Sequence, residues 1–305
     1  VSNLADFGIP SILGSPVQFE TLATMCYRFM ESGTVSNPLQ VVSTVGALLM
    51  LLGIIAVVAD YAVSRRASSQ VSGASTMKLS LGVARVPVTV VSWVLALAVT
   101  LGPILGLAHR ALLPAPGVPF TLETISLSNF QRTLSNPRVV DGFTNSVALA
   151  GGAALLSGLL GWAIGILVTR TRARTNTPLS LATLLPAALP GLIIGVGWLI
   201  VGRYTGLYNT RWVILLAYVC AFTALVLQAV RAPMSKIPVA VEEAARISGA
   251  GRVRSIVDTS GRMAVPAAFS GAVLVAVTAV RELTVSILLV APGTTTIGVQ
   301  LFNLQ

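Results

Sequence analysis

The stretch that decides the fold is residues 142–169, GFTNSVALAGGAALLSGLLGWAIGILVT, which contains no charged side chain. About 20 consecutive, largely apolar residues in a helix are enough to cross a lipid bilayer. Apolar and small residues run through the stretch without alternating with polar ones, so the pattern favours a helix over a strand. We therefore expect a transmembrane helix here.

The same pattern recurs along the chain. Further uncharged runs cover residues 38–59, 86–108, 175–202, 212–230 and 263–280, and the last is interrupted by Arg281 and Glu282 and continues from Leu283. Of the 305 residues, 54% are hydrophobic and only 10% are charged, whereas a soluble domain is typically about 25% charged. The expected fold is all-α, a polytopic transmembrane helix bundle with about six complete spans. The Pro- and Gly-rich stretch 184–198 predicts a kink or close helix packing.

Basic residues indicate how these spans are oriented. Most of the 20 Lys and Arg lie in three connecting segments, 64–85, 170–174 and 231–262. An even number of predicted spans separates each segment from the next, so all three share one side, and the positive-inside rule makes that side the cytoplasm. Segments 109–141 and 204–210 are then outside. The net charge of +10 does not indicate nucleic-acid binding, because the basic residues are scattered without interleaved aromatic residues.

A faint internal repeat relates the two ends of the chain. The tripeptide SIL occurs at 11–13 and 286–288, and at the same offset of 275 residues Thr21-Leu22 corresponds to Thr296-Ile297 and Tyr27 to Phe302. Internal repeats are common in transporters. We expect residues 1–63 to end a first half, with the tail of one span and one complete span. A basic Ser-rich cytoplasmic linker, 64–85, and a second half, 86–305, follow, and the last helix of that half is expected to be missing.

Residues 241–251, VEEAARISGAG, place charge between two apolar runs. Glu242 and Glu243 suit the N-terminus of a helix, and Glu242 is spaced to pair with Arg246 one turn later. Gly249 fits a left-handed C-cap, after which residues 252–258 can restart as a helix at an angle. The small alanines allow another surface to approach closely. Two interpretations follow: an ordinary solvated loop helix, or a docking element on the cytoplasmic side.

The same stretch resembles a known motif. Glu243, Ala244, Ala245 and Gly249 resemble the EAA motif of ABC importer permeases, the inner-membrane components of binding-protein-dependent transport. The family pattern ends in I-x-L-P, but residues 259–262 here read TSGR, and only the later Pro266 matches. This departure puts the coupling strength of the loop in question.

Other segments carry the resemblance further. Asn145-Ser146 is similar to the N-S/T that opens the core of these permeases. The opening LADFGIPSILG at 4–14, and Arg281-Glu282-Leu283 followed by SILL, resemble matching places in fused two-half permeases of the ferric-iron type.

The resemblance implies a fold of the type I ABC importer permease kind in the inner membrane of a bacterial cell. It also implies two partners: an ABC ATPase dimer that sits on the EAA loop at 231–262, and an extracytoplasmic solute-binding protein. The chain has no G-x-x-x-x-G-K-[ST] phosphate loop, so it is not itself an enzyme. ATP and Mg²⁺ would be bound by the ATPase, with no cofactor in this chain. Ferric iron is the first cargo implied; thiamine, phosphonates and polyamines stay open.

Charged residues near the outer ends of spans are candidates for a substrate pathway. Arg281 and Glu282 fall in the outer part of the sixth run, and Asp6 takes the position that matches Arg281 in the repeat. Charges at such depth are costly and usually face a cavity or a partner, so these three residues either line the pathway or form structural pairs. A single histidine, His109, and two distant cysteines, Cys26 and Cys220, give no metal site.

Two other function classes stay open. An ion-coupled secondary transporter usually needs acidic groups near the membrane centre, and Glu282 is the one candidate, although it is off-centre. A truncated, non-functional permease fragment is the other, because the first EAA loop and the last helix are absent from the sequence.

Overall fold

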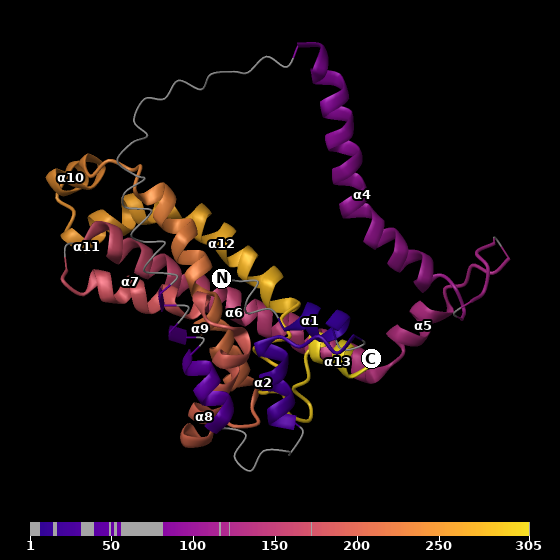
Figure 1. Cartoon of the computed structure of the whole chain (residues 1–305). Helices are drawn as coiled ribbons and strands as arrows, with labels where there is room; N and C mark the ends of the chain where they lie inside the picture. The colour runs from indigo at the N-terminus through magenta and orange to yellow at the C-terminus, as the bar shows by residue number, and fades with distance from the viewer. Residues whose placement is uncertain are drawn as a thin grey trace. The chain divides into compact units, whose positions relative to one another are not determined.

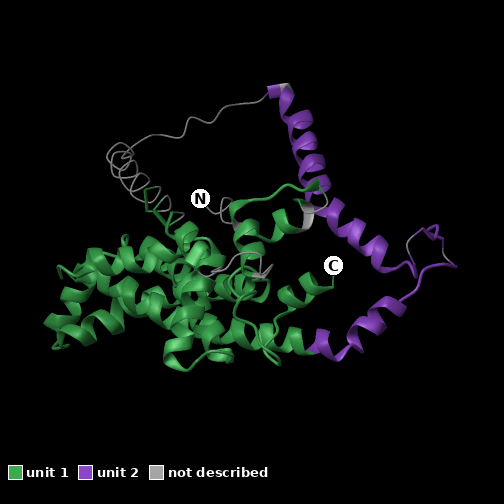
Figure 2. Ribbon diagram, turned by 60° about the horizontal axis from the view of Figure 1, so that its bottom comes forward, with its two compact units in different colours: residues 1–63, 141–305 green, residues 64–140 purple. Residues whose placement is uncertain are grey.

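The computed structural model describes residues 7–14, 17–31, 40–48, 50–51, 54–55, 82–115, 117–121, 123–171 and 173–304. Every element in this part of the chain is a helix (Figure 1). In chain order they are α1 (Gly8–Gly14), α2 (Leu22–Glu31), η3 (Gly82–Ala84), α4 (Arg85–Ala111), α5 (Ser128–Leu134), α6 (Pro137–Arg170), α7 (Asn176–Leu184), η4 (Leu185–Ala188), α8 (Gly191–Thr205), α9 (Arg211–Met234), α10 (Ala240–Ile247), α11 (Arg252–Ile256), η5 (Val257–Gly261), α12 (Arg262–Val280) and α13 (Ile297–Asn303). The chain divides into two compact units, one of residues 1–63 and 141–305 and the other of residues 64–140 (Figure 2).

Four helices of the described chain are long and apolar enough to cross a membrane: α4, α6, α9 and the continuous helix Arg252–Val280. A fifth crossing is possible if α7, η4 and α8 together form one span, although they are bent by 112°. The predictions of an all-α fold and of a multi-pass membrane protein are confirmed. Of the first predicted span, 38–59, residues 40–48, 50–51 and 54–55 are helical and the rest lie outside the described residues.

The fourth predicted span, 175–202, is not one straight helix. Leu189 is extended (φ −89°, ψ 146°), as expected for a residue that precedes a proline, and Pro190 is the N-cap of α8. On α8, a Cβ atom at Gly191 would lie 3.0 Å from Thr284 Cβ, and one at Gly195 would lie 2.8 Å from the Val285 carbonyl oxygen. The Pro- and Gly-rich stretch therefore produces both the predicted kink and the predicted close packing.

Helix α9 is the most buried helix of the larger unit, and α6 and α12 pack against it. A Cβ atom added at Gly161 of α6 would lie 2.5 Å from Val226 Cβ, and one at Gly271 of α12 would lie 2.9 Å from Val226 Cα. Gly165 meets Val230 in the same way. Small residues at such contacts let helix backbones approach closely, which is how helices associate where both the lipid and the side chains are apolar.

The sixth predicted run does not continue past its charged pair. Helix α12 ends at Val280, and the Glu282 carboxylate accepts a hydrogen bond from the Val285 N–H at 3.0 Å. This bond stabilises a turn in place of the next helical turn, because side-chain acceptors compete with the helix for backbone donors. The prediction that the span continues from Leu283 is wrong, and turns lead to α13 instead.

The Asn-Ser pair in α6 holds the start of α13. The Asn145 side-chain amide donates to the carbonyl oxygens of Gly293 (3.2 Å) and Thr295 (3.1 Å). The Ser146 hydroxyl accepts a hydrogen bond from the Ile297 N–H at 2.9 Å. Both side chains are buried, so one end of α6 is tied to the segment that precedes α13.

Residues related by the internal repeat contact each other. The rings of Tyr27 in α2 and Phe302 in α13 meet edge to face, with centroids 5.7 Å apart, and the fully buried Phe7 contacts both. Each copy also contains an equivalent hydrogen bond. The Ser11 hydroxyl donates to the Gly8 carbonyl (2.9 Å), and the Ser286 hydroxyl donates to the Leu283 carbonyl (3.2 Å). Gly8 and Leu283 are related by the same offset, so the repeat has a structural counterpart.

The smaller unit contains α4 and α5. None of the residues of α4 is buried. The Asn129 side-chain amide in α5 donates to the carbonyl oxygens of Ala111 (3.2 Å) and Leu113 (2.7 Å). These bonds satisfy the carbonyl group of the last residue of α4 and one just beyond the helix, neither of which has a partner within it. Most of the predicted linker 64–85 lies outside the described residues.

Candidate functional site

The loop between α9 and α12 forms the predicted helix–turn–helix. It consists of α10, α11 and the π-helical turn η5, which runs directly into α12. Figure 1 shows α10 and α11 at one end of the bundle of α6, α9 and α12, with α13 at the other end. The predicted cytoplasmic loop therefore lies away from the segment that Asn145 and Ser146 hold.

Gly249 ends α10 in a left-handed conformation (φ 91°), as predicted. The Gly249 N–H donates to the Arg246 carbonyl and the Ala250 N–H donates to the Ala245 carbonyl, both at 3.0 Å. This pair of bonds is the Schellman motif, which satisfies the last carbonyl groups of a helix and reverses the chain direction. The turn brings the start of α11 back beside α10.

The face of the loop that packs on α6 is fixed to that helix by a buried ion pair. Arg170 Nε lies 2.9 Å from Glu242 Oε1, and the two side chains are only 6% and 8% exposed. The Nε–H does not point along this contact, so the attraction is ionic without a hydrogen bond at that nitrogen. Arg170 Nη2 also donates to the Ile237 carbonyl at 2.9 Å. The two predicted cytoplasmic segments 170–174 and 231–262 thus meet, as their assignment to one side requires.

The predicted pairing of Glu242 with Arg246 is wrong. Glu242 turns inward to Arg170, whereas Arg246 is exposed. A buried carboxylate is not solvated by water, so it needs an opposite charge close by. An exposed carboxylate is solvated and does not need such a partner.

The TSGR stretch, where the chain departs from the family pattern, completes this anchor. Its first three residues lie in η5, and the buried Ser260 hydroxyl donates a hydrogen bond to the Glu242 carboxylate. Trp162 Nε1 of α6 donates to the Gly261 carbonyl at 2.9 Å. A side chain at Gly261 would crowd Ile166 and Trp162. The TSGR stretch therefore makes polar contacts both to α10, through Ser260, and to α6, through the Gly261 carbonyl.

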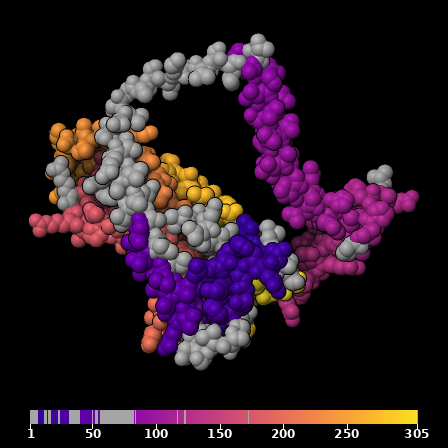
Figure 3. All heavy atoms as spheres, in the orientation of Figure 1, coloured from indigo at the N-terminus to yellow at the C-terminus, as the bar shows by residue number. Residues whose placement is uncertain are grey.

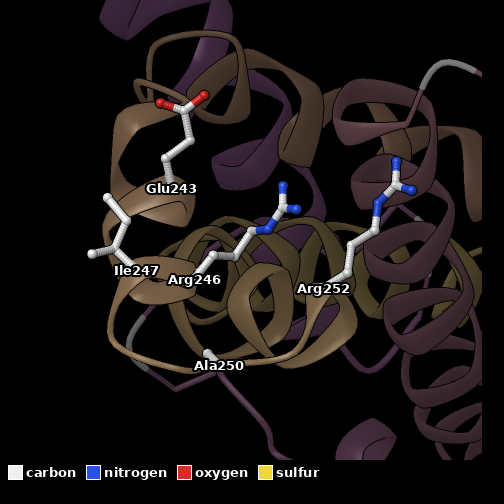
Figure 4. A pocket seen from close by; sticks show the side chains of 5 residues that line it. All are labelled: Glu243, Arg246, Ile247, Ala250 and Arg252. Carbon is white, nitrogen blue, oxygen red and sulfur yellow. The ribbon is translucent and has the colours of Figure 1, made fainter.

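The opposite face of the loop is exposed and carries both charged and apolar side chains. Glu243 and Ala244 are exposed, and so are the apolar side chains of Ile247 (89%), Val253 (75%) and Val239. A hollow of about 520 Å³ is lined by Glu243, Arg246, Ile247, Ala250 and Arg252 (Figure 4). Figure 3 shows the orange residues of this loop at the surface of the molecule. The loop is therefore fixed to α6 on one face and exposed on the other.

Comparison with known proteins agrees with the permease resemblance. The chain is 24% identical over 157 residues to the molybdate/tungstate transport system permease protein WtpB of Pyrococcus abyssi (strain GE5 / Orsay), a match that covers 52% of this chain and 63% of the relative. The chain thus spans less than two thirds of that protein. Its fold is similar to the crystal structure of a bacterial ABC transporter involved in import of the acidic polysaccharide alginate, with a TM-score of 0.59 and 18% identity over 74% of this chain and 81% of that one. No family model matches the chain.

These findings bear unequally on the predictions. The likeness to the alginate importer confirms the fold, and the sequence relative is itself named a transport system permease protein. Neither protein is named for iron, so the ferric-iron type has no support from them and stays a prediction.

Two of the candidate pathway residues, Arg281 and Glu282, lie where α12 ends. Arg281 is exposed and makes no ion pair among the described residues, and the Glu282 side chain is engaged by its own turn. Asp6 lies outside the described residues, so its pairing with Arg281 stays a prediction. A role of these residues in transport likewise stays a prediction.

The described residues bring no three His, Cys, Asp or Glu side chains together in a way that could hold a metal ion. Cys26 is buried in α2, and Cys220 is half-buried in α9. Both positions suit cysteines that serve as small packing residues.

Proposed function

We propose that this chain is the transmembrane permease subunit of an ATP-driven ABC importer. The observation that carries the proposal is the loop of α10 and α11, which has the EAA-like residues Glu243, Ala244, Ala245 and Gly249 on or beside a free face. The ion pair of Glu242 with Arg170 fixes the same loop to α6. The sequence relative named as a permease and the fold of the alginate importer support the same function.

In this proposal the chain is not an enzyme. A separate ABC ATPase subunit, acting as a dimer, binds ATP and Mg²⁺ and docks on the exposed face of the loop. An extracytoplasmic binding protein delivers the solute on the other side of the membrane, which is the inner membrane of a bacterial cell. Each partner binds one conformation of the permease more tightly than the other. The difference between these two affinities sets how far binding shifts the permease toward the preferred conformation.

Helix α6 offers a physical route between the two sides. Its inner end carries Arg170, which holds the docking loop, and its outer part carries Asn145 and Ser146, which hold the start of α13. At 1.5 Å per residue, Ser146 and Arg170 are about 36 Å apart along one helix. A movement of the loop that tilts α6 would therefore also displace the segment before α13.

Two cargo classes have an observation in their favour. The resemblance of residues 4–14 and 281–288 to ferric-iron permeases favours ferric iron, and the relative named for molybdate and tungstate favours a tetrahedral oxyanion. The external binding protein would make the choice, because the chain itself carries few charged groups in its spans.

The test is uptake into proteoliposomes that contain the chain with its ATPase and binding protein. We expect uptake of either radiolabelled molybdate or ferric iron that requires internal ATP and continues when the proton gradient is collapsed. Uptake that follows the gradient and ignores ATP would instead identify an ion-coupled secondary transporter, for which Glu282 is the candidate acid. A complex that forms and hydrolyses ATP but moves no solute would indicate a non-functional permease.

A further inference from the structure

The hollow beside Gly249 is lined by two guanidinium groups that form no ion pair with any described residue. Among the described residues the ion pairs are Arg28 with Glu20, Arg170 with Glu242, and Arg254 with Asp258. Arg246 and Arg252 belong to none of them, and both line the hollow. Their side chains extend in the same direction from α10 and α11 (Figure 4).

This arrangement follows from features of the fold. The Schellman turn at Gly249 folds α11 back, so that Arg252 comes beside Arg246. Glu242, which could have neutralised Arg246 one turn away, is instead buried against Arg170. Arg252 is the first residue of α11, where the helix dipole disfavours positive charge. The exposed face of the loop therefore carries more positive than negative charge, and neither Arg246 nor Arg252 forms an ion pair with a described residue.

The surroundings of the hollow favour a protein as the partner. Exposed charges on the loop are five basic (Lys236, Arg246, Arg252, Arg254, Arg262) and two acidic (Glu243, Asp258). Ile247 lines the hollow at 89% exposure, and Val253 follows Arg252 at 75%. Protein interfaces combine an apolar core with complementary charges at its edge, and the exposed Ile247 and Val253 beside the two arginines fit that combination.

We propose that the hollow receives a carboxylate side chain of the ATPase subunit, an Asp or Glu that lies between Arg246 and Arg252 while apolar groups of that subunit cover Ile247. A carboxylate fits because a guanidinium presents paired N–H donors that match its two oxygens. The inference rests on the proposed function, because it assigns the chemistry of the partner surface that meets the docking loop.

The test measures binding of the ATPase to the full chain in nanodiscs of neutral phosphatidylcholine. The ATPase is chosen among the ABC ATPases of the same organism as the one whose hydrolysis the wild-type chain stimulates. We expect Arg246→Gln with Arg252→Gln to weaken binding about 30-fold or more and to flatten its dependence on salt between low and high NaCl. The matched control is Arg254→Gln with Arg262→Gln, which removes the same charge from the same loop and should change binding less than about 3-fold.

A charge swap identifies the partner residue. Arg246→Glu should abolish binding, and one Asp→Arg or Glu→Arg substitution on the ATPase should restore it. If the double Gln variant binds like the wild type, the inference is overturned while the proposed function stands. If its loss appears only in nanodiscs with anionic phosphatidylglycerol, the arginines bind lipid and the inference is equally overturned. If the wild-type chain stimulates no ATPase at all, the proposed function itself fails.

Discussion

Arg170, the last residue of α6, and Glu242 of α10 form a buried ion pair with 2.9 Å between Nε and Oε1. The pair joins the loop of α10 and α11 to α6, whose other end holds the segment before α13. Removing one member of a buried pair leaves an unpaired charge in a medium that solvates it poorly. The stability of the loop therefore depends on both residues being charged.

Glu242→Gln is expected to lower the free energy of unfolding by about 3 kcal/mol or more, because it leaves the Arg170 guanidinium buried without a counter-charge. Unfolding in nanodiscs, followed by circular dichroism against denaturant, measures the change. ATPase stimulation by the folded variant should fall as well, since the loop loses its attachment to α6.

Asp258→Asn provides the control for this variant. It breaks the ion pair of Arg254 and Asp258, whose side chains are 79% and 60% exposed, and such pairs contribute about 1 kcal/mol or less. Equal losses for the two variants would show that the burial of Glu242 has no energetic consequence.

Gly249→Ala should destabilise the loop by about 1 kcal/mol or more, because a residue with a Cβ atom is strained at φ 91°. The control lies two residues further on. Gly251→Ala occupies φ −63° with nothing within 4 Å of the added atom, and it should be neutral or slightly stabilising. Thermal unfolding and affinity for the ATPase should rank the two variants in this order, and the reverse order would rule out the turn as the reason for glycine.

Gly161→Ala should cost about 1–3 kcal/mol, the usual range for overpacking. The new methyl group would lie 2.5 Å from Val226 Cβ, so α6 and α9 must separate. Gly151→Ala on the same helix adds the same atom where nothing lies within 4 Å and should be neutral or stabilise the helix by up to about 1 kcal/mol. Similar unfolding curves for both variants would mean that α6 does not pack on α9 at this depth.

A double-mutant cycle between Tyr27 and Phe302 should give a coupling energy of about 0.5–1.5 kcal/mol, as measured for aromatic pairs. The cycle compares Tyr27→Ala, Phe302→Ala and the double variant by unfolding in nanodiscs. Tyr27→Phe retains the ring and should retain the coupling. Strictly additive losses would place the two repeat copies out of contact.

Local chemistry predicted the parts of the site that depend on neighbouring residues. Gly249 as a left-handed cap, the restart of a helix near Arg252 and the kink near Pro190 all follow from rules that act over a few residues. Continuous apolar runs predicted α6 and α9 for the same reason.

Contacts between distant segments could not be predicted in this way. The sequence offers Glu242 a nearby cation in Arg246, and only the packing of α10 on α6 shows that Arg170 takes that place. The end of α12 was not predicted, because hydropathy contains no information about hydrogen bonds. The Glu282 carboxylate accepts a hydrogen bond from the Val285 N–H, and this bond stabilises a turn there. Ser260 and Trp162 likewise had no local signal, since their partners lie on other helices.

The contact between Tyr27 and Phe302 has an evolutionary consequence. When two identical subunits form such a contact, every mutation enters both sides at once, so a change that suits one side must be tolerated by the other. Here the two equivalent positions belong to one chain and are already different, one ring with a hydroxyl group and one without. Selection can therefore adjust each side of this contact separately, and the two copies are free to specialise.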